Sequence, residues 1–441
     1  MSNRNTFILE NVRIFTGDEF IDNGYVYVKD GTIEEVKAGS SPDRIQLHAP
    51  IRSYSGYSVI PGLIDSHIHA LSGNMASIEQ SLRFGVTTVC DMHNNPDDNE
   101  RLKKLAAGPE YKSLYADFKC AGLGALIPGG WPIPVIKKKF SHSGKSDSDL
   151  AEYTASWPNL SVPEDAVPFV EQQVKQNGAS YIKMFHEVGD TVGMNLPLPS
   201  PDLQKAVVDA AHQLGVVAVG HALSYQGTMV LLRAGVDGLT HIFCDEPPSD
   251  DYIALMKETG AHCNPTLGLV ASQTDEGREL FEWFMEDPLS ERLLMSRAAY
   301  RPHGLASSQK PKSSIKHARA NTRALYKAGV PILAGTDASG TGVGLPYGLG
   351  LHMELYALIH HAGLSVADAL RSATSIPADR FKFHDRGRIE KGKKADLVLI
   401  KTDVAEFLED RQNRLMPLAA VFRNGTVAAP YERFWNWGTR T

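Results

Sequence analysis

A pattern of helix followed by strand recurs along the middle of this 441-residue chain. In each copy a helix-like segment ends in Gly, and an apolar run rich in β-branched residues follows. Gly takes the left-handed conformation just past a helix at no steric cost, so each Gly marks a helix end. Helices that alternate with buried strands predict parallel βαβ units with right-handed crossovers. The copies are centred on Gly85, Gly178, Gly215, Gly235, Gly260 and Gly329.

Eight apolar runs in this region are candidate strands, and each leaves room for a helix after it. This number predicts an α/β fold, namely a (β/α)8 TIM barrel. An open, doubly wound sheet is the alternative, but no Gly-rich fingerprint follows an early strand, which disfavours its dinucleotide-binding form. The predicted strands are Val59–His67, Val86–Asp91, Leu114–Cys120, Tyr181–Phe185, Val216–His221, Gly238–Ile242, Ala261–Pro265 and Pro331–Asp337.

Both ends of the chain differ from the middle, because they contain short alternating strands. Asp30-Gly31 and Asn424-Gly425 lie between alternating apolar runs and are strong hairpin signals. We expect the two ends to pair into one small β-sandwich domain that covers the barrel. The predicted boundaries are residues 1–58 plus 387–441 for the sandwich and 59–386 for the barrel.

The composition is that of an ordinary globular protein, with 42% hydrophobic and 22% charged residues. A formal net charge of −6 gives no reason to expect nucleic acid or an anionic membrane as a partner. The sequence has neither an apolar run long enough to cross a bilayer nor a secretory signal at its start. The scattered cysteines lack C-x-x-C spacing and are typical of reduced thiols. We therefore expect a cytoplasmic protein.

The motif His67-x-His69 lies at the end of the first predicted barrel strand. Side chains alternate along a strand, so these two imidazoles point to the same face. Two imidazoles at the end of a buried strand suit a divalent metal, although such a pair can also be a surface accident or two satisfied core histidines. The metal interpretation therefore requires further ligands from the rest of the chain.

Further candidate ligands occur at the ends of later predicted strands, at the end of the barrel where function is located. They are Lys183 in SYIKMF, His221 in VAVGHA, His241 in GLTHIF and Asp337 in LAGTDAS. Each one alone has an ordinary structural explanation, such as a polar core residue, a snorkelling lysine or a helix cap. Their joint occurrence with the histidine pair favours one shared metal site.

These motifs, in this order, resemble the metal-dependent amidohydrolase superfamily: PGLIDSHIHA, IKMF, GHA, LTHIF and GTDAS, followed by GRIEKGKKADLVLI and FRNGTV. Lys183 makes the chain similar to the branch whose carboxylated lysine bridges two metals. That branch includes prolidase-like peptidases, ochratoxin-type amidases and phosphotriesterase relatives. The motif style also resembles imidazolonepropionase-like proteins. Imidazolonepropionase itself works with one metal and without a bridging lysine, so Lys183 argues against that particular activity.

The resemblance implies two divalent metal ions, for which Zn²⁺ is the best match to nitrogen and oxygen ligands, and N-carboxylation of Lys183. Desolvation and like charge both lower the pKa of a lysine beside two cations, and the neutral amine can react with carbon dioxide to give a carbamate. One alternative stays open: an unmodified Lys183, with a single metal held by the histidine pair and Asp337. The implied ligands are His67, His69 and Asp337 for one ion, His221 and His241 for the other, and Lys183 between them.

The resemblance implies hydrolysis of an amide or peptide-like C–N bond by a hydroxide that bridges the metals, with Asp337 and Lys183 as catalytic residues. Asp337 would accept a proton as general base and then return it to the leaving nitrogen as general acid. Other functions stay open: a lactonase, esterase, phosphotriesterase-like hydrolase or decarboxylase on the same site, or a non-catalytic scaffold. The intact ligand set argues against the scaffold. We expect a small-molecule substrate and a homo-oligomeric assembly.

The segment that begins AGLGALIPGGWPIPVIKKKF and runs to about Asp165 is longer than an ordinary βα loop, which has roughly 2–6 residues. Long loops on the functional face form lids or pocket walls. Apolar residues such as Trp131 indicate a substrate that is partly apolar or aromatic, although a surface loop packed on its own barrel explains the segment equally well. Other candidate substrate contacts near strand ends are His93, His186, Tyr225 and His262.

Overall fold

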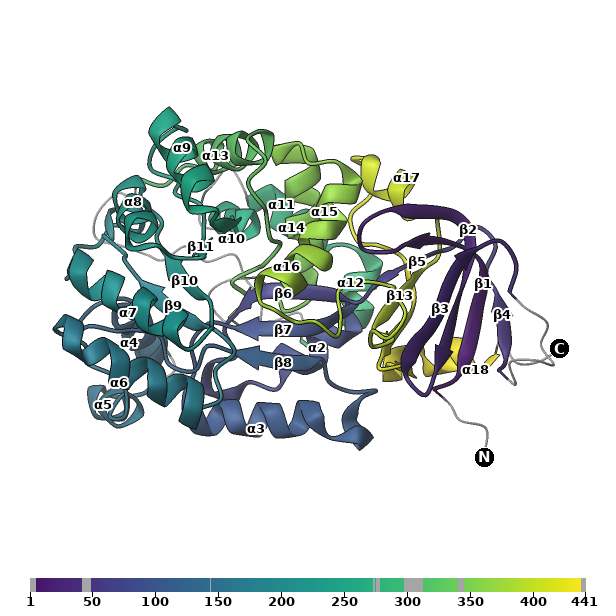
Figure 1. The fold of residues 1–441 in the computed structure, drawn as a ribbon, viewed down its shortest axis with the longest axis horizontal. Helices are drawn as coiled ribbons and strands as arrows, with labels where there is room; N and C mark the ends of the chain where they lie inside the picture. The colour runs from purple at the N-terminus through teal and green to yellow at the C-terminus, as the bar shows by residue number, and fades with distance from the viewer. Residues whose placement is uncertain are drawn as a thin grey trace.

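Two regions of the chain differ in architecture (Figure 1), and the larger one consists of helices around short strands while the smaller one is mostly sheet. The smaller region, on the right in Figure 1, is built from the first and the last strands of the chain. Among the described residues, no helix is long and apolar enough to cross a membrane. The computed structural model describes residues 5–41, 49–142, 144–272, 274, 278–296, 312–339 and 345–437.

The smaller region contains a single eight-stranded sheet with the order β15-β14-β13-β5-β1-β2-β3, and β4 pairs with β1. β13 pairs antiparallel with β5, which joins the two ends of the chain. The expected arrangement of these strands as a sandwich stays a prediction. The strands are β1 (Phe7–Phe15), β2 (Phe20–Lys29), β3 (Thr32–Ala38), β4 (Ile51–Ser53), β5 (Ser58–Pro61), β13 (Leu397–Ile400), β14 (Leu418–Arg423) and β15 (Thr426–Val427).

Both predicted hairpins are present in this sheet. Asp30 and Gly31 connect β2 to β3, and their φ angles are +53° and +82°. Asn424 and Gly425 connect β14 to β15 with φ angles of +47° and +70°. Two successive residues with positive φ are the requirement of a type I′ turn, which explains the choice of Asp-Gly and Asn-Gly. The hairpin predictions are therefore confirmed.

The larger region contains two parallel sheets. The first has the order β6-β7-β8 and the second the order β12-β11-β10-β9. Every pairing within these sheets is parallel, as the βαβ pattern predicts. The strands are β6 (Leu63–Ile68), β7 (Val86–Asp91), β8 (Asp117–Cys120), β9 (Ile182–Phe185), β10 (Ala218–His221), β11 (Gly238–Thr240) and β12 (His262–Asn264).

The two sheets are connected by isolated parallel bridges. No continuous ladder of hydrogen bonds joins them among the described residues. The bridges link Ala125 to Met184, Cys263 to Ile332, and Ile68 to Ala338. The last predicted strand, Pro331–Asp337, is therefore not a regular strand, and the described residues form a mixed α/β fold without a closed barrel sheet. The close approach at Gly335 explains the irregularity, because a Cβ there would lie 2.2 Å from Asn264 and 2.9 Å from the backbone of His67.

The first predicted strand, Val59–His67, is divided at Gly62. The part before it, β5, belongs to the terminal sheet, whereas the part after it, β6, belongs to the first parallel sheet. The Gly62 N–H donates to the Asp396 carbonyl, and a Cβ at this position would lie 2.2 Å from the hydroxyl of Thr87. The terminal sheet thus extends beyond the expected boundary at residue 58.

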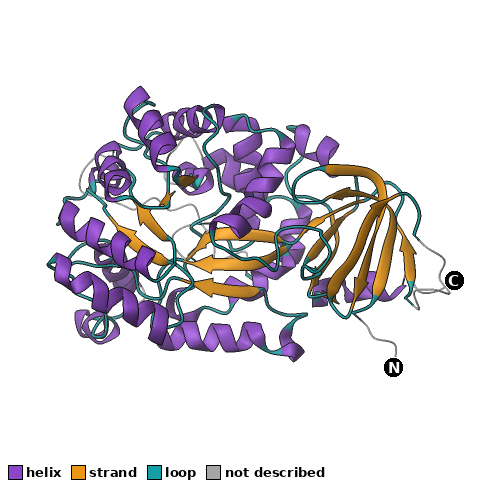
Figure 2. Cartoon of the chain, viewed as in Figure 1, coloured by secondary structure: helices purple, strands orange, loops and turns teal. Residues whose placement is uncertain are grey.

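Helices surround the parallel strands (Figure 2). Ser200 caps one of them by accepting a hydrogen bond from the Leu203 N–H, and Pro201 starts it, as predicted. The helices are α2 (Ala76–Arg83), α3 (Pro96–Ala107), α4 (Ile133–His142), α5 (Asp147–Tyr153), α6 (Ala166–Glu171), α7 (Pro201–Gln213), α8 (Tyr225–Ala234), α9 (Asp250–Thr259), α10 (Leu267–Ser272), α11 (Arg278–Met285), α12 (Pro288–Leu293), α13 (Ile315–Lys327), α14 (Leu349–Ala357), α15 (Val366–Ser372), α16 (Ser375–Arg380), α17 (Val404–Glu409) and α18 (Glu432–Trp437).

The long segment after β8 contains α4 and α5, so it is not an irregular loop. Its apolar side chains form a separate hydrophobic cluster that includes Leu126, Ile136 and Trp157. Phe185, at the end of β9, belongs to the same cluster, and Trp131 packs against it. The segment therefore packs onto the carboxyl end of the second parallel sheet.

Candidate metal centre

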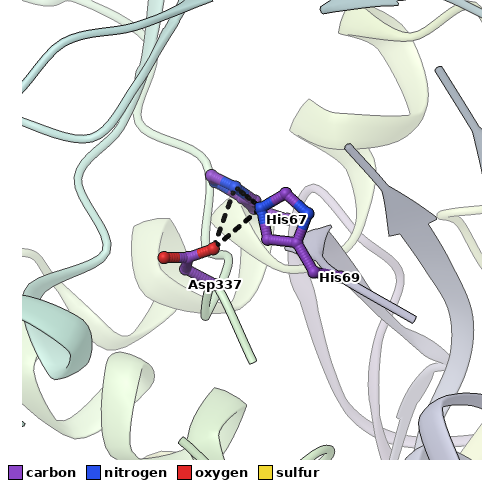
Figure 3. A group of neighbouring side chains, drawn as sticks. All are labelled: His67, His69 and Asp337. Carbon is purple, nitrogen blue, oxygen red and sulfur yellow. Dashed lines mark hydrogen bonds and ion pairs between the residues drawn. The ribbon is translucent and has the colours of Figure 1, made fainter. Parts of the chain in front are cut away.

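Three predicted ligands converge at the carboxyl end of β6 (Figure 3). The Nε2 atoms of His67 and His69 lie 3.4 Å apart. The Asp337 Oδ1 atom lies 3.3 Å from the His67 Nε2 and 3.0 Å from the His69 Nε2. Their ligand atoms all lie within 4.8 Å of one another, and two imidazoles with one carboxylate are a donor set that suits Zn²⁺ or a similar ion. These three residues therefore fit a divalent metal.

The backbone around this group is held by Asp65, which is fully buried in β6. Its carboxylate accepts hydrogen bonds from the His67 N–H at 3.2 Å and from the Thr336 hydroxyl at 2.8 Å. The Asp337 N–H in turn donates to the His67 carbonyl at 2.7 Å. Asp337 itself has a φ of +54°, a left-handed conformation that these bonds stabilise. The two chain segments that supply the ligands are thus fastened directly to each other.

The protonation states of this group favour a metal. Burial lowers the pKa of His67 well below its ordinary value, and the charge of Lys183 acts in the same direction. Burial alone would raise the pKa of Asp337, but the hydrogen bond with His69 and the charges of His69, His241 and Lys183 together outweigh it, so the pKa lies below its ordinary value. A neutral imidazole and an ionised carboxylate are the forms that bind metal ions.

Lys183 lies in β9 with its side chain fully buried. Its Nζ atom donates a hydrogen bond to the Thr240 hydroxyl at 2.5 Å and lies 5.5 Å from the centre of the Phe185 ring. Burial lowers its pKa from 10.5 to about 7, against the opposing effect of Asp337 and Asp91. A large fraction of the amine is therefore neutral near pH 7, which is the reactive form of a lysine.

His221 and His241 extend the group along the second parallel sheet. The centre of the His241 ring lies 4.9 Å from that of His67 and 4.6 Å from that of His221. The His241 Nδ1 atom lies 2.7 Å from the Thr266 hydroxyl, and the His221 Nε2 atom lies 3.0 Å from the Glu187 carboxylate. Burial lowers the pKa of both histidines well below the ordinary value, so both are neutral.

Two buried carboxylates near the group were absent from the sequence prediction. Asp91 ends β7 and accepts hydrogen bonds from the backbone N–H groups of Ala70 at 2.6 Å and His93 at 2.9 Å. Glu187 follows β9 and bonds to His221. Asp91 ends its strand as the predicted ligands do, which is a usable signal in the sequence. Glu187 lies next to His186, and the sequence analysis chose the histidine instead.

Two of the predicted substrate contacts lie beside the group. The ring of Trp131 stacks on that of His221, with 5.3 Å between the centres and 24° between the planes. The ring of His93 lies 4.6 Å from that of Trp157. Its Nδ1 accepts a hydrogen bond from the Gly124 N–H at 2.9 Å, whereas its buried Nε2 has no partner among the described residues. His93 therefore carries its hydrogen on Nε2.

The other three candidate contacts have different surroundings. The His186 N–H donates to the His221 carbonyl at 2.8 Å, and the His186 side chain is buried. Tyr225 starts α8, and its ring packs on Phe243 with 5.4 Å between the centres. His262 begins β12 instead of ending it.

The structure does not bring His262 to the metal ligands. His262 pairs with Gly238 at the amino end of β11, whereas His241 follows the carboxyl end of that strand. Its ring lies 5.8 Å from that of Phe381, the residue that follows α16. His262 is the second residue of the predicted strand Ala261–Pro265, so the sequence already placed it near the amino end of that strand.

The model of the amidohydrolase family matches residues 58–431, and the chain belongs to this family. An uncharacterized protein of Mycobacterium bovis is 24% identical over 292 residues, which span 65% of this chain and 66% of that relative, just under two thirds of its length. The imidazolonepropionase of Thermoplasma volcanium is 22% identical over 428 residues, which cover 93% of this chain and 91% of the enzyme.

Solved structures of the same fold include two hydrolases. A Xaa-Pro dipeptidase with bound methionine in its active site is 21% identical, with a TM-score of 0.70 over 96% of this chain and 99% of that chain. The ochratoxinase of A. niger is 17% identical, with a TM-score of 0.69 over 96% of this chain and 95% of that chain. At these identities the likeness concerns the fold.

Proposed function

We propose that this chain is a metal-dependent hydrolase that cleaves an amide or peptide-like C–N bond in a small, partly apolar or aromatic substrate. The observation that carries the proposal is the convergence of His67, His69 and Asp337 beside the fully buried Lys183. Membership of the amidohydrolase family supports the reaction class. The similarity to a dipeptidase and an ochratoxinase supports a substrate with an amide-type bond.

The proposed centre would hold two divalent ions, most simply Zn²⁺, with N-carboxylated Lys183 as a shared ligand. The ions would lower the pKa of a bound water towards about 7 and polarise the carbonyl of the substrate. His67, His69 and Asp337 would hold one ion, and His221 and His241 the other. The neutral state of the buried histidines and the partly neutral amine of Lys183 are consistent with these roles.

In the proposed reaction, Asp337 moves the proton. Its carboxylate is ionised at neutral pH, so it can accept a proton during the attack on the carbonyl carbon and donate it to the leaving nitrogen. Trp131 and Phe185 line the same region with apolar surface and reduce its access to water. The Nε2–H of His93 is a free donor that suits a polar group of the substrate.

We also propose that the larger region is a (β/α)8 barrel covered by a β-sandwich domain, with the predicted boundaries of 59–386 and of 1–58 plus 387–441 shifted so that β5 (Ser58–Pro61) belongs to the sandwich. The three isolated bridges support this arrangement, because they join the parallel sheets at β8 to β9 and, through the segment 332–338, at β12 to β6. A cytoplasmic location and a homo-oligomeric assembly stay predictions from the sequence.

The proposal is tested by metal analysis and a substrate panel. Protein produced with added zinc should contain two ions per chain and should hydrolyse N-acyl amino acids, dipeptides, aryl amides or carbamates. Lys183→Ala and Asp337→Asn should both abolish turnover. Less than one ion per chain would contradict a metal-dependent enzyme, and turnover of lactones alone would show that the C–N assignment is wrong.

A further inference from the structure

Glu187 is a buried carboxylate in the turn after β9, and its side chain has no exposed surface. Its Oε2 atom lies 3.0 Å from the His221 Nε2 and accepts a hydrogen bond from the Leu223 N–H at 3.2 Å. Its Oε1 atom accepts hydrogen bonds from the Gly189 N–H at 2.7 Å and the Thr191 hydroxyl at 3.4 Å. Both oxygens therefore face hydrogen-bond donors.

This arrangement determines which nitrogen of His221 carries the hydrogen. Backbone N–H groups can only donate, so they hold the two oxygens of Glu187 as acceptors. Against an ionised Glu187 the His221 Nε2 is the donor of the 3.0 Å bond, and the neutral imidazole keeps its lone pair on Nδ1. His241 has the opposite arrangement, because its Nδ1 is the nitrogen that bonds to a side chain, the Thr266 hydroxyl.

The same contact fixes the rotation of the ring. Trp131 stacks on one face of the His221 imidazole, and such stacking is kept when the ring flips by 180° about the Cβ–Cγ bond, because the plane of the ring stays the same. That flip would exchange the nitrogen facing Glu187 for a carbon and would remove one hydrogen bond from the buried carboxylate, at a cost of about 1–3 kcal/mol. The packing therefore sets the plane of the ring, and Glu187 selects its orientation.

We propose that Glu187 is the positioning residue of His221, and that it makes Nδ1 the ligand nitrogen on the side of the centre formed by His221 and His241. The inference rests on the proposed function, because it assumes that this side holds a metal. A carboxylate bonded to the second nitrogen of a ligand histidine makes the imidazole a stronger donor.

The test measures metal binding instead of turnover. Glu187→Gln replaces one carboxylate oxygen with an amide N–H₂. This group would face one of the hydrogen-bond donors that Glu187 now accepts from, which are His221 and the N–H groups of Leu223 and Gly189. Zinc affinity, measured by competition with a chromophoric chelator, should fall about 10–100-fold for one of the two ions and stay unchanged for the other. The visible spectrum of the cobalt-loaded variant should change for that same ion, because the spectrum reports the ligand geometry.

Glu354→Gln is the matched control. Glu354 is also fully buried, and its carboxylate accepts hydrogen bonds from the backbone N–H groups of Leu267 at 3.0 Å and Gly268 at 2.8 Å. Its replacement removes a buried carboxylate without touching His221, so both zinc affinities should stay at the wild-type value. Glu187→Asp keeps the charge but shortens the side chain, and it should give an intermediate loss.

The outcomes separate the inference from the proposed function. Wild-type protein that binds a single zinc ion would overturn the dinuclear function itself. Wild-type protein that binds two ions, together with a Glu187→Gln variant of unchanged affinities and spectrum, would overturn the role of Glu187 alone. If neither the Gln nor the Asp variant folds, Glu187 is a residue of the folded core, and the positioning role is equally overturned.

Discussion

Replacement of Lys183 by Met should stabilise the metal-free protein while abolishing its activity. The side chain of Lys183 is fully buried, and its amine makes a hydrogen bond with a hydroxyl group, that of Thr240. An amine in such surroundings is more costly to bury than a thioether of similar length, because its charged form is strongly solvated in the unfolded chain. A residue that serves a metal centre therefore weakens the fold when the metal is absent.

The magnitude follows from the pKa of Lys183, which burial lowers from 10.5 to about 7. Each pKa unit corresponds to about 1.4 kcal/mol, so at pH 7 the buried amine lowers the free energy of unfolding by roughly 4 kcal/mol. Loss of the hydrogen bond to Thr240 offsets about 1 kcal/mol of the gain. The net expectation for Lys183→Met is a stabilisation of about 3 kcal/mol.

The pH dependence gives the sharper test. The lowered pKa of Lys183 means that the unfolded chain binds more protons than the folded protein between about pH 7 and 10.5. The free energy of unfolding of the wild type should therefore rise with pH across this window, and the advantage of the variant should disappear by its upper end. Below pH 7 the advantage should be constant.

Urea unfolding of the metal-free proteins in buffer depleted of carbon dioxide measures this difference directly. Lys205→Met is the control, because Lys205 lies on the surface of α7 with 60% of its side chain exposed and pairs with Asp209. It should be neutral at every pH. A Lys183→Met variant that is less stable than the wild type at pH 7, or whose advantage does not depend on pH, would refute the reasoning.

Three other changes address the chemistry, the fold and the substrate region. Asp337→Asn should keep the circular dichroism spectrum and lower kcat by at least about 100-fold, because an amide cannot accept the proton; a loss below tenfold would contradict this role. Asp117→Asn should destabilise by about 3 kcal/mol in urea, since it leaves the buried Arg386 short of one carboxylate. Although burial opposes it, the charge of Arg386 lowers the pKa of Asp117 to about 2, so the stabilisation should be present above pH 4 and lost as the pH falls towards 2. Trp131→Ala should raise KM more than it lowers kcat, and an unchanged KM would exclude Trp131 from the substrate site.

The positions of the metal ligands could be predicted because they depend on local rules. The alternation of side chains places His67 and His69 on one face of β6, and the observed Nε2 separation of 3.4 Å agrees with that geometry. Parallel strands bring their carboxyl ends to one edge, so His221 and His241 lie near the pair although they are far away in sequence. Both rules need only the type of the element and its direction.

Two features of the structure depend on contacts between distant segments and could not be predicted from the sequence: the break between β5 and β6, and the surroundings of Glu187. β5 and β6 read as one strand, because the break at Gly62 depends on Thr87 and on Asp396, which lies far along the chain. The role of Glu187 likewise depends on the backbone of residues 189 and 223, which no local pattern connects. Such partners are visible only once the strands are in register.

Two of the proposed metal ligands lie in irregular backbone. His241 and Asp337 have φ angles of +83° and +54°, in a region that residues other than Gly seldom occupy. Both side chains meet His67: the Asp337 Oδ1 lies 3.3 Å from the His67 Nε2, and the centre of the His241 ring lies 4.9 Å from that of His67. The segment Pro331–Asp337 makes isolated bridges and is not the regular strand that was predicted. Its last residue, Asp337, still reaches the site. The hydrogen bonds that Asp65 and the His67 carbonyl accept compensate the strain at Asp337, and a left-handed residue held in this way is consistent with the proposed binding role.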